Sequence, residues 1–398
     1  MKNNTITSPQ GFRAAGVSCG IKEGGRLDLG LLVGEASCPA AAVFTRNRFC
    51  GAPVVVGREH VRDGQLRAIV VNSGRANAAT GRRGLADARE MCRRVARTIG
   101  TADTEVLPAS TGLIGAFLPM PKVRRGIDAA LASLSSSTAA GRRFARAIMT
   151  TDTRLKLAGQ QVRIGRSRVT IAGCCKGSGM IAPNLATMLA FVTTDAMIPA
   201  RTLKRLLPAA VEHTFNRVTV DECPSTSDMV VVMASGATGR VTSNAATASF
   251  SAALRAVCES LAYQIAADGE GATRVLKVTV RGARTAKEAH AAARAIAASP
   301  LVKTAVNGGD PNWGRIVQAL GAAPAAYRPE RVTIRLDKTV LFTRGAPAPR
   351  LEKRKLAKIM RRRDVPIVIE LGAGRFNDRV LTCDLSREYV SINADYHT

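Results

Sequence analysis

Long apolar runs are absent from this sequence. No uninterrupted stretch reaches the ~18 residues that a membrane-spanning helix requires. Residues 1–12 also lack the apolar core of a secretory signal peptide. We therefore expect a protein that has no membrane partner and works in the cytoplasm.

Cysteine pairs at the short spacing of a zinc site are missing as well. The nine cysteines are Cys19, Cys38, Cys50, Cys92, Cys174, Cys175, Cys223, Cys258 and Cys383. The neighbours Cys174 and Cys175 would point to opposite faces of a strand, which argues against a shared metal or redox site. We expect reduced, buried thiols and no metal site among the cysteines.

Acidic and aromatic residues are scarce. Asp and Glu number 30 against 58 Lys and Arg, which gives a net charge of +28, and aromatic residues make up 4% of the chain. Such a charge is typical of proteins that bind nucleic acid or anionic surfaces. The basic residues, however, occur along the whole chain with little aromatic interleaving and no nucleic-acid motif. A solvated basic surface explains them at least as well, and a nucleic-acid-binding protein remains an alternative.

Helical and strand patterns alternate in the first half of the chain. Apolar residues recur at helical spacing in residues 85–99 and 123–134, which predicts two amphipathic helices. Between them, residues 104–115 predict a strand that ends in a turn at Pro108–Gly112. Residues 161–173 contain two short alternating runs around a glycine, the pattern of a hairpin.

The second half is also mixed. Its patterns predict helices at 203–211 and 254–265, strands at 229–233 and 275–280, and two more strands between residues 365 and 398. With 398 residues, the chain is long enough for two or three compact units or one large layered sandwich. These mixed patterns of helices and strands predict an α/β fold.

A glycine-rich loop leads into an apolar strand at residues 176–192. A threonine in an apolar strand is usually just a small polar residue of the core. Here, small residues surround the bond between Ala186 and Thr187, so the hydroxyl of Thr187 could attack the Ala186 carbonyl. Hydrolysis of the resulting ester would leave Thr187 as a new amino terminus. Its α-amine, with an unperturbed pKa of ~7.7–8.0, would then serve as the base for its own hydroxyl.

Acyl transfer also requires donors for the oxyanion that develops on the attacked carbonyl. The predicted turn offers two, the hydroxyl of Thr111 and the backbone N–H of Gly112. The alternative is an ordinary turn at the end of a strand. The residues alone leave both open.

Seven short blocks along the chain occur in a recognisable order. The longest is Lys176–Phe191. The others are Gly11–Gly16, Ser110–Gly115, Met149–Thr153, Asp268–Thr273, Asp310–Arg315 and Ile392–Tyr396. Together they resemble the bifunctional ornithine acetyltransferases, or glutamate N-acetyltransferases, of arginine biosynthesis, and Lys176–Phe191 is similar to the self-cleavage segment of that family.

The resemblance implies an α/β fold in which sheets stack between helical layers, an α-β-β-α sandwich. It also implies a cut between Ala186 and Thr187. The resulting fragments, 1–186 and 187–398, are expected to stay intertwined and to form a dimer of fragment pairs.

The resemblance further implies the site and the reaction. Thr187 is the nucleophile, and Thr111 and Gly112 are the oxyanion donors. The substrate contacts are Thr153, Lys176, Thr187, Glu270, Asn393 and Thr398. Lys176 suits an α-carboxylate and Glu270 suits the ornithine ammonium. N-acetylornithine acetylates Thr187, ornithine leaves, and glutamate takes the acetyl group. This reaction needs no metal or organic cofactor, and some family members also accept acetyl-CoA.

Several positions depart from the family pattern. Arg75 and Ser227 stand where asparagine is usual, Ala79 where cysteine is common, and Leu381 where tryptophan is expected. These changes bear on substrate preference more than on the cut, because the cutting segment is intact. Another alternative keeps the Thr187 nucleophile but lets water accept the acyl group, as in aminopeptidases that resemble this fold.

Overall fold

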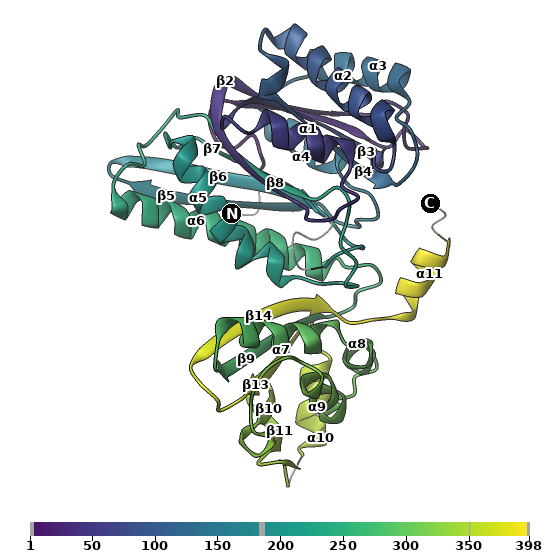
Figure 1. The fold of residues 1–398 in the computed structure, drawn as a ribbon, viewed down its shortest axis with the longest axis vertical. Coiled ribbons are helices and arrows are strands. Elements are labelled where there is room, and N and C mark those ends of the chain that lie inside the picture. Colours follow the sequence, from purple (N-terminus) through teal and green to yellow (C-terminus); the bar gives the residue numbers. More distant parts are fainter. Residues whose placement is uncertain (1–3, 183–187, 350, 396–398) are drawn as a thin grey trace. The chain divides into compact units, whose positions relative to one another are not determined.

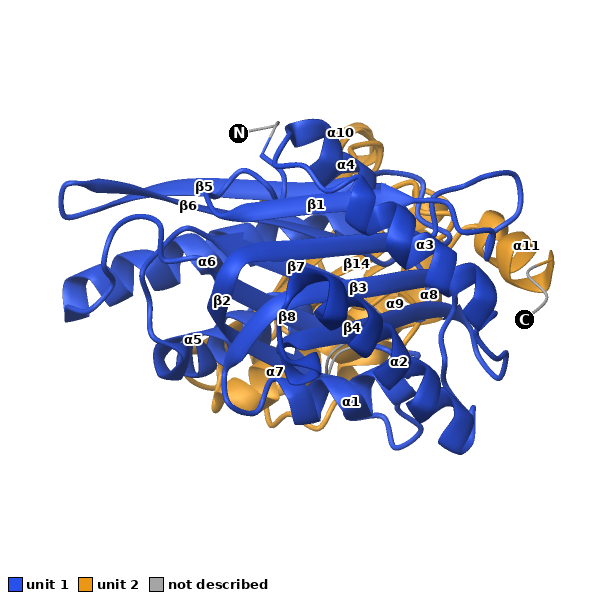
Figure 2. Cartoon of the chain, turned by 90° about the horizontal axis from the view of Figure 1, so that it is seen from above, with its two compact units in different colours: residues 1–216, 223–265, 398 blue, residues 217–222, 266–397 orange. Residues whose placement is uncertain are grey.

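The computed structural model describes residues 4–182, 188–349 and 351–395. They form two compact units (Figure 2). Unit 1 takes its described residues from 1–216 and 223–265, and unit 2 takes its own from 217–222 and 266–397. These boundaries differ from those of the fragments 1–186 and 187–398, which concern a cut in the backbone.

Eight strands among the described residues form the sheet of unit 1, in the order β4-β3-β2-β8-β7-β6-β5, with β1 paired to β2. Figure 1 labels the strands β2 to β8 of this sheet. The strands are β1 (Phe12–Val17), β2 (Leu29–Phe44), β3 (Gln65–Arg75), β4 (Val106–Leu113), β5 (Lys156–Ile164), β6 (Ser167–Lys176), β7 (Leu189–Thr194) and β8 (Met229–Ala234). The helices are α1 (Ala52–His60), α2 (Gly81–Ile99), α3 (Met120–Ala132), α4 (Thr138–Ala147), α5 (Ala200–Glu212) and α6 (Asn244–Ala267), the last of which ends in unit 2.

The long strand β2 connects two halves of this sheet. Its first residues pair with β1 and β3, whereas Ala40–Phe44 pair with β8. The register with β3 shifts between Val33 and Cys38, and such an irregularity bends a strand. The two halves face each other across one apolar core, to which β3 contributes Ile69 and β7 contributes Phe191.

Helices cover the outer faces of both halves. On α2, the buried residues Ala88, Met91 and Val95 follow the predicted helical spacing and pack on β1–β3 together with α3. On the other half, the side chain of Gln264 in α6 bonds both the N–H and the carbonyl of Leu157 in β5, at 3.1 and 3.0 Å. Unit 1 is therefore the predicted α-β-β-α sandwich.

Strands β7 and β8 lie in the middle of the sandwich. All six residues of each strand are buried, which explains their nearly continuous apolar sequences. They run parallel, with Leu189 opposite Met229. The first residues of the two strands consequently lie side by side at the same end of the sheet.

Six strands among the described residues form the sheet of unit 2, in the order β12-β11-β10-β13-β9-β14. They are β9 (Val275–Ala283), β10 (Thr333–Leu336), β11 (Thr339–Thr343), β12 (Ala346–Pro347), β13 (Asp364–Glu370) and β14 (Phe376–Cys383). The helices are α7 (Ala286–Ala298), α8 (Pro300–Asn307), α9 (Trp313–Gly321), α10 (Lys353–Met360) and α11 (Arg387–Asp395). Side chains of the sheet and of α7–α10 share one core.

Most of the predicted helices and strands are confirmed, with two exceptions. The turn expected at Pro108–Gly112 is wrong, since β4 continues to Leu113. The tail was expected to hold only two strands, but α11 follows β14. This helix escaped prediction because it buries no apolar residue, and its Val390 is 62% exposed.

The nine cysteines are all free thiols. Six are buried as predicted, whereas Cys19 and Cys50 are half-buried and the expectation is wrong for the exposed Cys223. Cys174 belongs to the core between the two sheet halves, and the Sγ of Cys175 lies 3.8 Å from the Leu261 carbonyl oxygen of α6. The two neighbours thus point to opposite faces. Within the described residues, no helix is both long and apolar enough to cross a membrane.

Candidate active site

The two predicted oxyanion donors lie at the carboxyl end of β4. This strand runs parallel to β3, with Ser73 opposite Thr111 and Gly74 opposite Gly112. The predicted turn is replaced by strand because β3 supplies hydrogen-bond partners that the local sequence does not reveal. Thr111 is buried, and its role as an oxyanion donor stays a prediction.

Gly112 and Gly74 approach each other closely. Gly112 has a φ of +122°, and a Cβ built on it would lie 2.4 Å from the carbonyl carbon of Gly74. Both the conformation and the lack of space therefore require glycine at position 112. The backbone of this predicted donor is fixed by the fold.

Hydrogen bonds beneath this pair hold the ends of both strands. The Ser110 hydroxyl donates to Asn72 Oδ1 at 2.5 Å, and Asn72 Nδ2 donates to the Arg75 carbonyl at 2.8 Å. Arg75, one of the departures from the family pattern, directs its guanidinium to the carbonyl of Phe117. The end of β3 is thus tied to the chain that follows β4.

Lys22, which the sequence analysis did not single out, lies beside this strand end. Asp28 accepts hydrogen bonds from the backbone N–H groups of Ile21 and Lys22, at 2.7 and 2.9 Å, and so shapes the loop. A Cβ built at Gly74 would lie 3.3 Å from Cγ of Lys22, whose Nζ donates to the Met149 carbonyl at 2.6 Å. Burial lowers the pKa of Lys22 to about 8, against the opposing effect of Asp28.

A buried ion pair follows Met149. Asp152 accepts from Lys156 Nζ at 2.6 Å and from the Gly177 N–H at 2.7 Å, and the two charged side chains are 0% and 1% exposed. Burial by itself would raise the pKa of Asp152, but the positive charges of Lys156 and Lys176 outweigh it, and the pKa falls to about 2. Asp152 is therefore a carboxylate at neutral pH.

The substitution Asp152→Asn is expected to destabilise the protein by about 3–5 kcal/mol at neutral pH, because it leaves the Lys156 ammonium buried without its counter-charge. In the wild type, the depressed pKa of Asp152 stabilises the fold above the unfolded pKa of about 3.9. This contribution, about 2–3 kcal/mol, is lost as the pH falls through the folded pKa of about 2. Urea unfolding at pH 7 and at low pH measures both effects.

Asp128→Asn is the matched control for that measurement. Asp128 pairs with Arg94 where both side chains are substantially exposed, and such pairs contribute about 0–1 kcal/mol. Equal destabilisation by the two substitutions would contradict the role given to Asp152.

Lys176, the predicted substrate lysine, is the last residue of β6 and is only 3% exposed. It stands opposite Leu189, the first residue of β7. The next residue but one, Ser178, lies 2.7 Å from the Thr151 hydroxyl, oxygen to oxygen. Thr153, another predicted contact, is exposed on the turn that leads from Asp152 into β5.

The predicted cleavage residues Ala186 and Thr187 lie outside the described residues, as does Thr398. On either side of the cleavage residues, Ala182 and Met188 are the nearest described ones, and both are buried. The Met188 N–H donates to Asp228 Oδ1 at 2.9 Å, and the Met229 N–H donates to the Met188 carbonyl at 3.1 Å. The start of β7 is therefore anchored on the segment that precedes β8.

Glu270 and Asn393 contact each other in unit 2. Asn393 Nδ2 donates to Glu270 Oε2 at 2.8 Å, and also to the Tyr389 carbonyl at 2.9 Å. The Ser386 hydroxyl donates to the Gly271 carbonyl at 2.7 Å, which joins the start of α11 to the loop of Glu270. These two predicted substrate contacts are thus brought together from segments more than a hundred residues apart.

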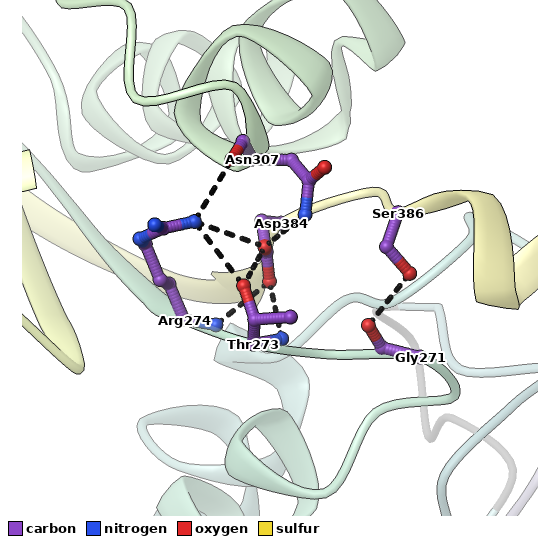
Figure 3. A network of polar contacts seen from close by, with 6 residues as sticks. All are labelled: Gly271, Thr273, Arg274, Asn307, Asp384 and Ser386. Atoms are coloured by element: carbon purple, nitrogen blue, oxygen red, sulfur yellow. Dashed lines mark hydrogen bonds and ion pairs between the residues drawn. The ribbon is translucent and has the colours of Figure 1, made fainter. Parts of the chain in front are cut away.

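A buried carboxylate fixes the same loop (Figure 3). Asp384, 1% exposed, accepts from the backbone N–H groups of Thr273 and Arg274, each at 2.8 Å. It also accepts from the Thr273 hydroxyl at 2.5 Å and from Asn307 Nδ2 at 2.7 Å. Three distant segments of unit 2 are tied together through this one side chain.

The sequence model of the ArgJ family matches residues 13–398. The chain belongs to the ArgJ family. One relative, the arginine biosynthesis bifunctional protein ArgJ of Symbiobacterium thermophilum, is 44% identical over 99% of this chain and 98% of its own. The protein of the same name from Geobacter sulfurreducens is 44% identical over 98% of this chain and 99% of its own.

Solved structures of the ArgJ family also resemble this chain. An ornithine acetyltransferase of Mycobacterium tuberculosis, in complex with ornithine, is 38% identical over 46% of this chain and 96% of its own, with a TM-score of 0.41. The ArgJ protein of Bacillus halodurans is 40% identical over 46% of this chain and 95% of its own, with a TM-score of 0.45.

Two further positions that depart from the ArgJ family pattern, Ser227 and Leu381, are buried and hydrogen-bonded through their backbone. Ser227 is buried, and its N–H donates to the Ser225 hydroxyl at 3.1 Å. Leu381 is buried in β14, and its carbonyl accepts from the Thr219 N–H at 3.0 Å. Their effect on substrate preference stays a prediction.

Sequence reasoning missed Lys22 and Asp228 in unit 1, which contact Gly74 and Met188, and Asp384 in unit 2, which fixes the loop after Glu270. Asp228 belongs to the block around Ser227, but its link to Met188 spans 40 residues. The contacts of Asp384 with Thr273 and Asn307 span 111 and 77 residues. No pattern of local spacing reveals contacts of that range.

Proposed function

We propose that this chain is a self-cleaving acetyltransferase that moves the acetyl group of N-acetylornithine to glutamate through an ester on Thr187. The observation that carries the proposal is the position of Lys176. Its ammonium group is buried, and its backbone stands opposite Leu189, two residues after Thr187. Lys176 is a cation that suits an α-carboxylate, and it lies beside the start of β7, the strand that follows Thr187 in the chain.

The remaining roles follow from chemistry. Thr111 and Gly112 donate to the oxyanion as the Thr187 oxygen attacks the acetyl carbon. The C–N bond to ornithine then breaks, ornithine leaves with a proton on its α-amine, and the amine of glutamate attacks the ester in turn. Glu270 and Asn393, in contact at 2.8 Å, suit the ornithine ammonium. Thr153 and Thr398 complete the proposed substrate contacts.

The assembly also belongs to the proposal. β7 lies between β6 and β8, so fragments 1–186 and 187–398 would both contribute strands to one sheet and stay together after the cut. We further propose a dimer of such pairs, a cytoplasmic location and acetyl-CoA as a second donor. The name of the relatives, arginine biosynthesis bifunctional protein, supports a place in amino-acid synthesis.

Release of ornithine from N-acetylornithine is expected to depend on glutamate. In a transferase, each turnover needs the acceptor to clear the acetyl ester, so ornithine and N-acetylglutamate should form in equal amounts, and without glutamate release should stop after one turnover. Amino-acid analysis of timed samples measures both products. Sustained release without glutamate would instead identify the aminopeptidase-like hydrolase.

A further inference from the structure

A cluster of positive charge in unit 2 has no part in the proposed acetyl transfer. Residues 353–363 contain seven basic residues among eleven and no acidic residue. They form α10 and the turn that follows it, and all seven basic residues are exposed: Lys353, Arg354, Lys355, Lys358, Arg361, Arg362 and Arg363. Three of them have a partner, since Lys355 pairs with Glu352, Arg362 pairs with Asp337, and Arg363 donates to the Ala267 carbonyl. The side chains of the other four make no hydrogen bond or ion pair with a described residue.

Helical spacing gives α10 a basic face and an apolar face. Leu356, Ile359 and Met360 form the apolar face, and all three are buried in the core of unit 2. A helix that lies on a membrane inserts its apolar face into the lipid, and this face of α10 is already covered. The basic face therefore suits a polyanion in water.

A cavity lies beside the first turn of α10. Its volume of about 540 Å³ falls within the ~300–1,000 Å³ that is typical of ligand sites. Its walls come from the start of α9 and from α10 (Figure 1). Asp310–Gly314 line one side, and Leu351, Lys353 and Leu356 line the other. The block Asp310–Arg315, which has no role in the proposed reaction, thus faces the basic helix across a cavity.

Trp313 gives this cavity an aromatic wall. Its ring stacks on Phe342 of the unit 2 core, with centroids 5.4 Å apart and 27° between the ring planes. The contact with Phe342 fixes the ring, and Trp313 is only half-buried, so part of its surface stays open to a ligand. The flat face of any nucleic-acid base can stack on such a ring. The fold thus supplies the aromatic side chain that the basic run lacks in the sequence.

A hydrogen-bond acceptor lies on the same wall. Asn312 accepts the Arg315 N–H at 3.0 Å, which caps α9, and its Nδ2 donates to Asp310 Oδ2 at 2.9 Å. The other oxygen of Asp310, Oδ1, accepts from no described residue. It is therefore available to the amino group of adenine or cytosine, which thymine lacks. A carboxylate repels phosphate, so the phosphates of such a ligand belong on α10.

We propose that unit 2 binds single-stranded nucleic acid, with one base stacked on Trp313 in the cavity and the neighbouring phosphates along the basic face of α10. A duplex keeps its bases paired and stacked, whereas a single strand can place one in the cavity without that cost. The amino group of the bound base donates to Asp310. This binding is a second function, which does not depend on the proposed acetyl transfer.

The test uses the fluorescence of Trp313, the only tryptophan of the chain. A short oligodeoxyadenylate added to the purified full chain should quench the emission. The logarithm of its affinity should fall with log[salt] at a slope of about −3, the value for four phosphates. An oligothymidylate of equal length should bind about 5-fold more weakly, because it has no amino group for Asp310. Equal affinities would refute the role of Asp310, and binding that leaves Trp313 emission unchanged would overturn the proposal.

Two other ligands show what the site recognises. Heparin carries negative charge but no bases, so it should leave the emission of Trp313 unchanged. Adenosine monophosphate has one phosphate and should bind far more weakly than the oligonucleotide. Quenching by heparin, or equal affinity for adenosine monophosphate, would refute binding of a strand along α10.

The triple substitution of Lys353→Gln, Arg354→Gln and Lys358→Gln removes three cations from the basic face of α10. We expect it to reduce the magnitude of the salt slope by about 2, because three fewer phosphates are neutralised. Salt titrations of the wild type and of the variant measure the difference. An unchanged slope would overturn the proposal.

The matched control removes the same charge from α2 in unit 1. Arg82→Gln, Arg93→Gln and Arg97→Gln change three exposed arginines of that helix. This variant should bind the oligonucleotide like the wild type. If it loses as much affinity as the α10 variant, the net charge of +28 attracts nucleic acid without a site, and the proposal fails.

Trp313→Leu tests the aromatic wall. Loss of base stacking should weaken binding of the oligonucleotide by at least about 5-fold, measured by anisotropy of a labelled strand. Wild-type affinity in this variant would refute the stacking. Because Trp313 also packs on the core of unit 2, thermal unfolding shows whether the variant folds. If it does not, the wild-type titrations with the oligonucleotide and with heparin decide the question.

Discussion

Thr187→Ala is expected to leave the chain whole at 41.9 kDa, whereas the wild type yields two fragments. Alanine lacks the hydroxyl that attacks the preceding carbonyl and later carries the acetyl group. The substitution should therefore abolish both the cut and acetyl transfer. Intact mass spectrometry of both purified proteins measures the first effect, and N-acetylglutamate formation measures the second.

Thr187→Ser provides the control for this substitution. Serine retains a hydroxyl on the same carbon, so some cutting and some transfer should persist. The wild-type C-terminal fragment should begin at Thr187. A wild-type protein with one uncut mass, or a cut at another bond, would refute the assignment of the nucleophile.

Gly112→Ala is expected to lower kcat by about 10²–10³-fold, the effect of losing one oxyanion donor. The new Cβ would lie 2.4 Å from the Gly74 carbonyl carbon, at a φ of +122° that side-chain-bearing residues rarely adopt. Because the obstacle is backbone, one of the two strand ends must shift. Steady-state kinetics on the cut enzyme measures kcat, and the extent of cutting shows whether self-cleavage needs the same geometry.

Gly115→Ala is the control that tests the effect of a positive φ without a steric clash. Gly115 also has a positive φ of +85°, but a Cβ built on it meets no atom within 4 Å. Alanine there should cost about 1 kcal/mol of stability and leave kcat near that of the wild type. If both variants keep wild-type kcat, Gly112 is not an oxyanion donor.

The sequence was sufficient to predict a helix or strand wherever the spacing of apolar residues within that element reveals it. The spacing of Ala88, Met91 and Val95 predicts α2, and the alternating runs around Gly165 predict the hairpin of β5 and β6. The sequence was insufficient where an element depends on a segment far away in the chain or buries no apolar face. The strand through Ser110–Gly112 depends on β3, and α11 has no buried apolar face from which it could be predicted.

The sequence by itself determined the class of chemistry: the order of seven blocks indicates the ArgJ family and a threonine nucleophile, because such motifs are contiguous in the chain. Tertiary structure alone decided which groups surround the site. It brings the backbones of Gly74 and Gly112 close together and buries Lys176 opposite the start of β7. It also joins Asp228 to the Met188 N–H by a hydrogen bond. The physical reason is that strand pairing and burial join residues far apart in sequence, and that burial and neighbouring charges shift the pKa values of their carboxyl groups.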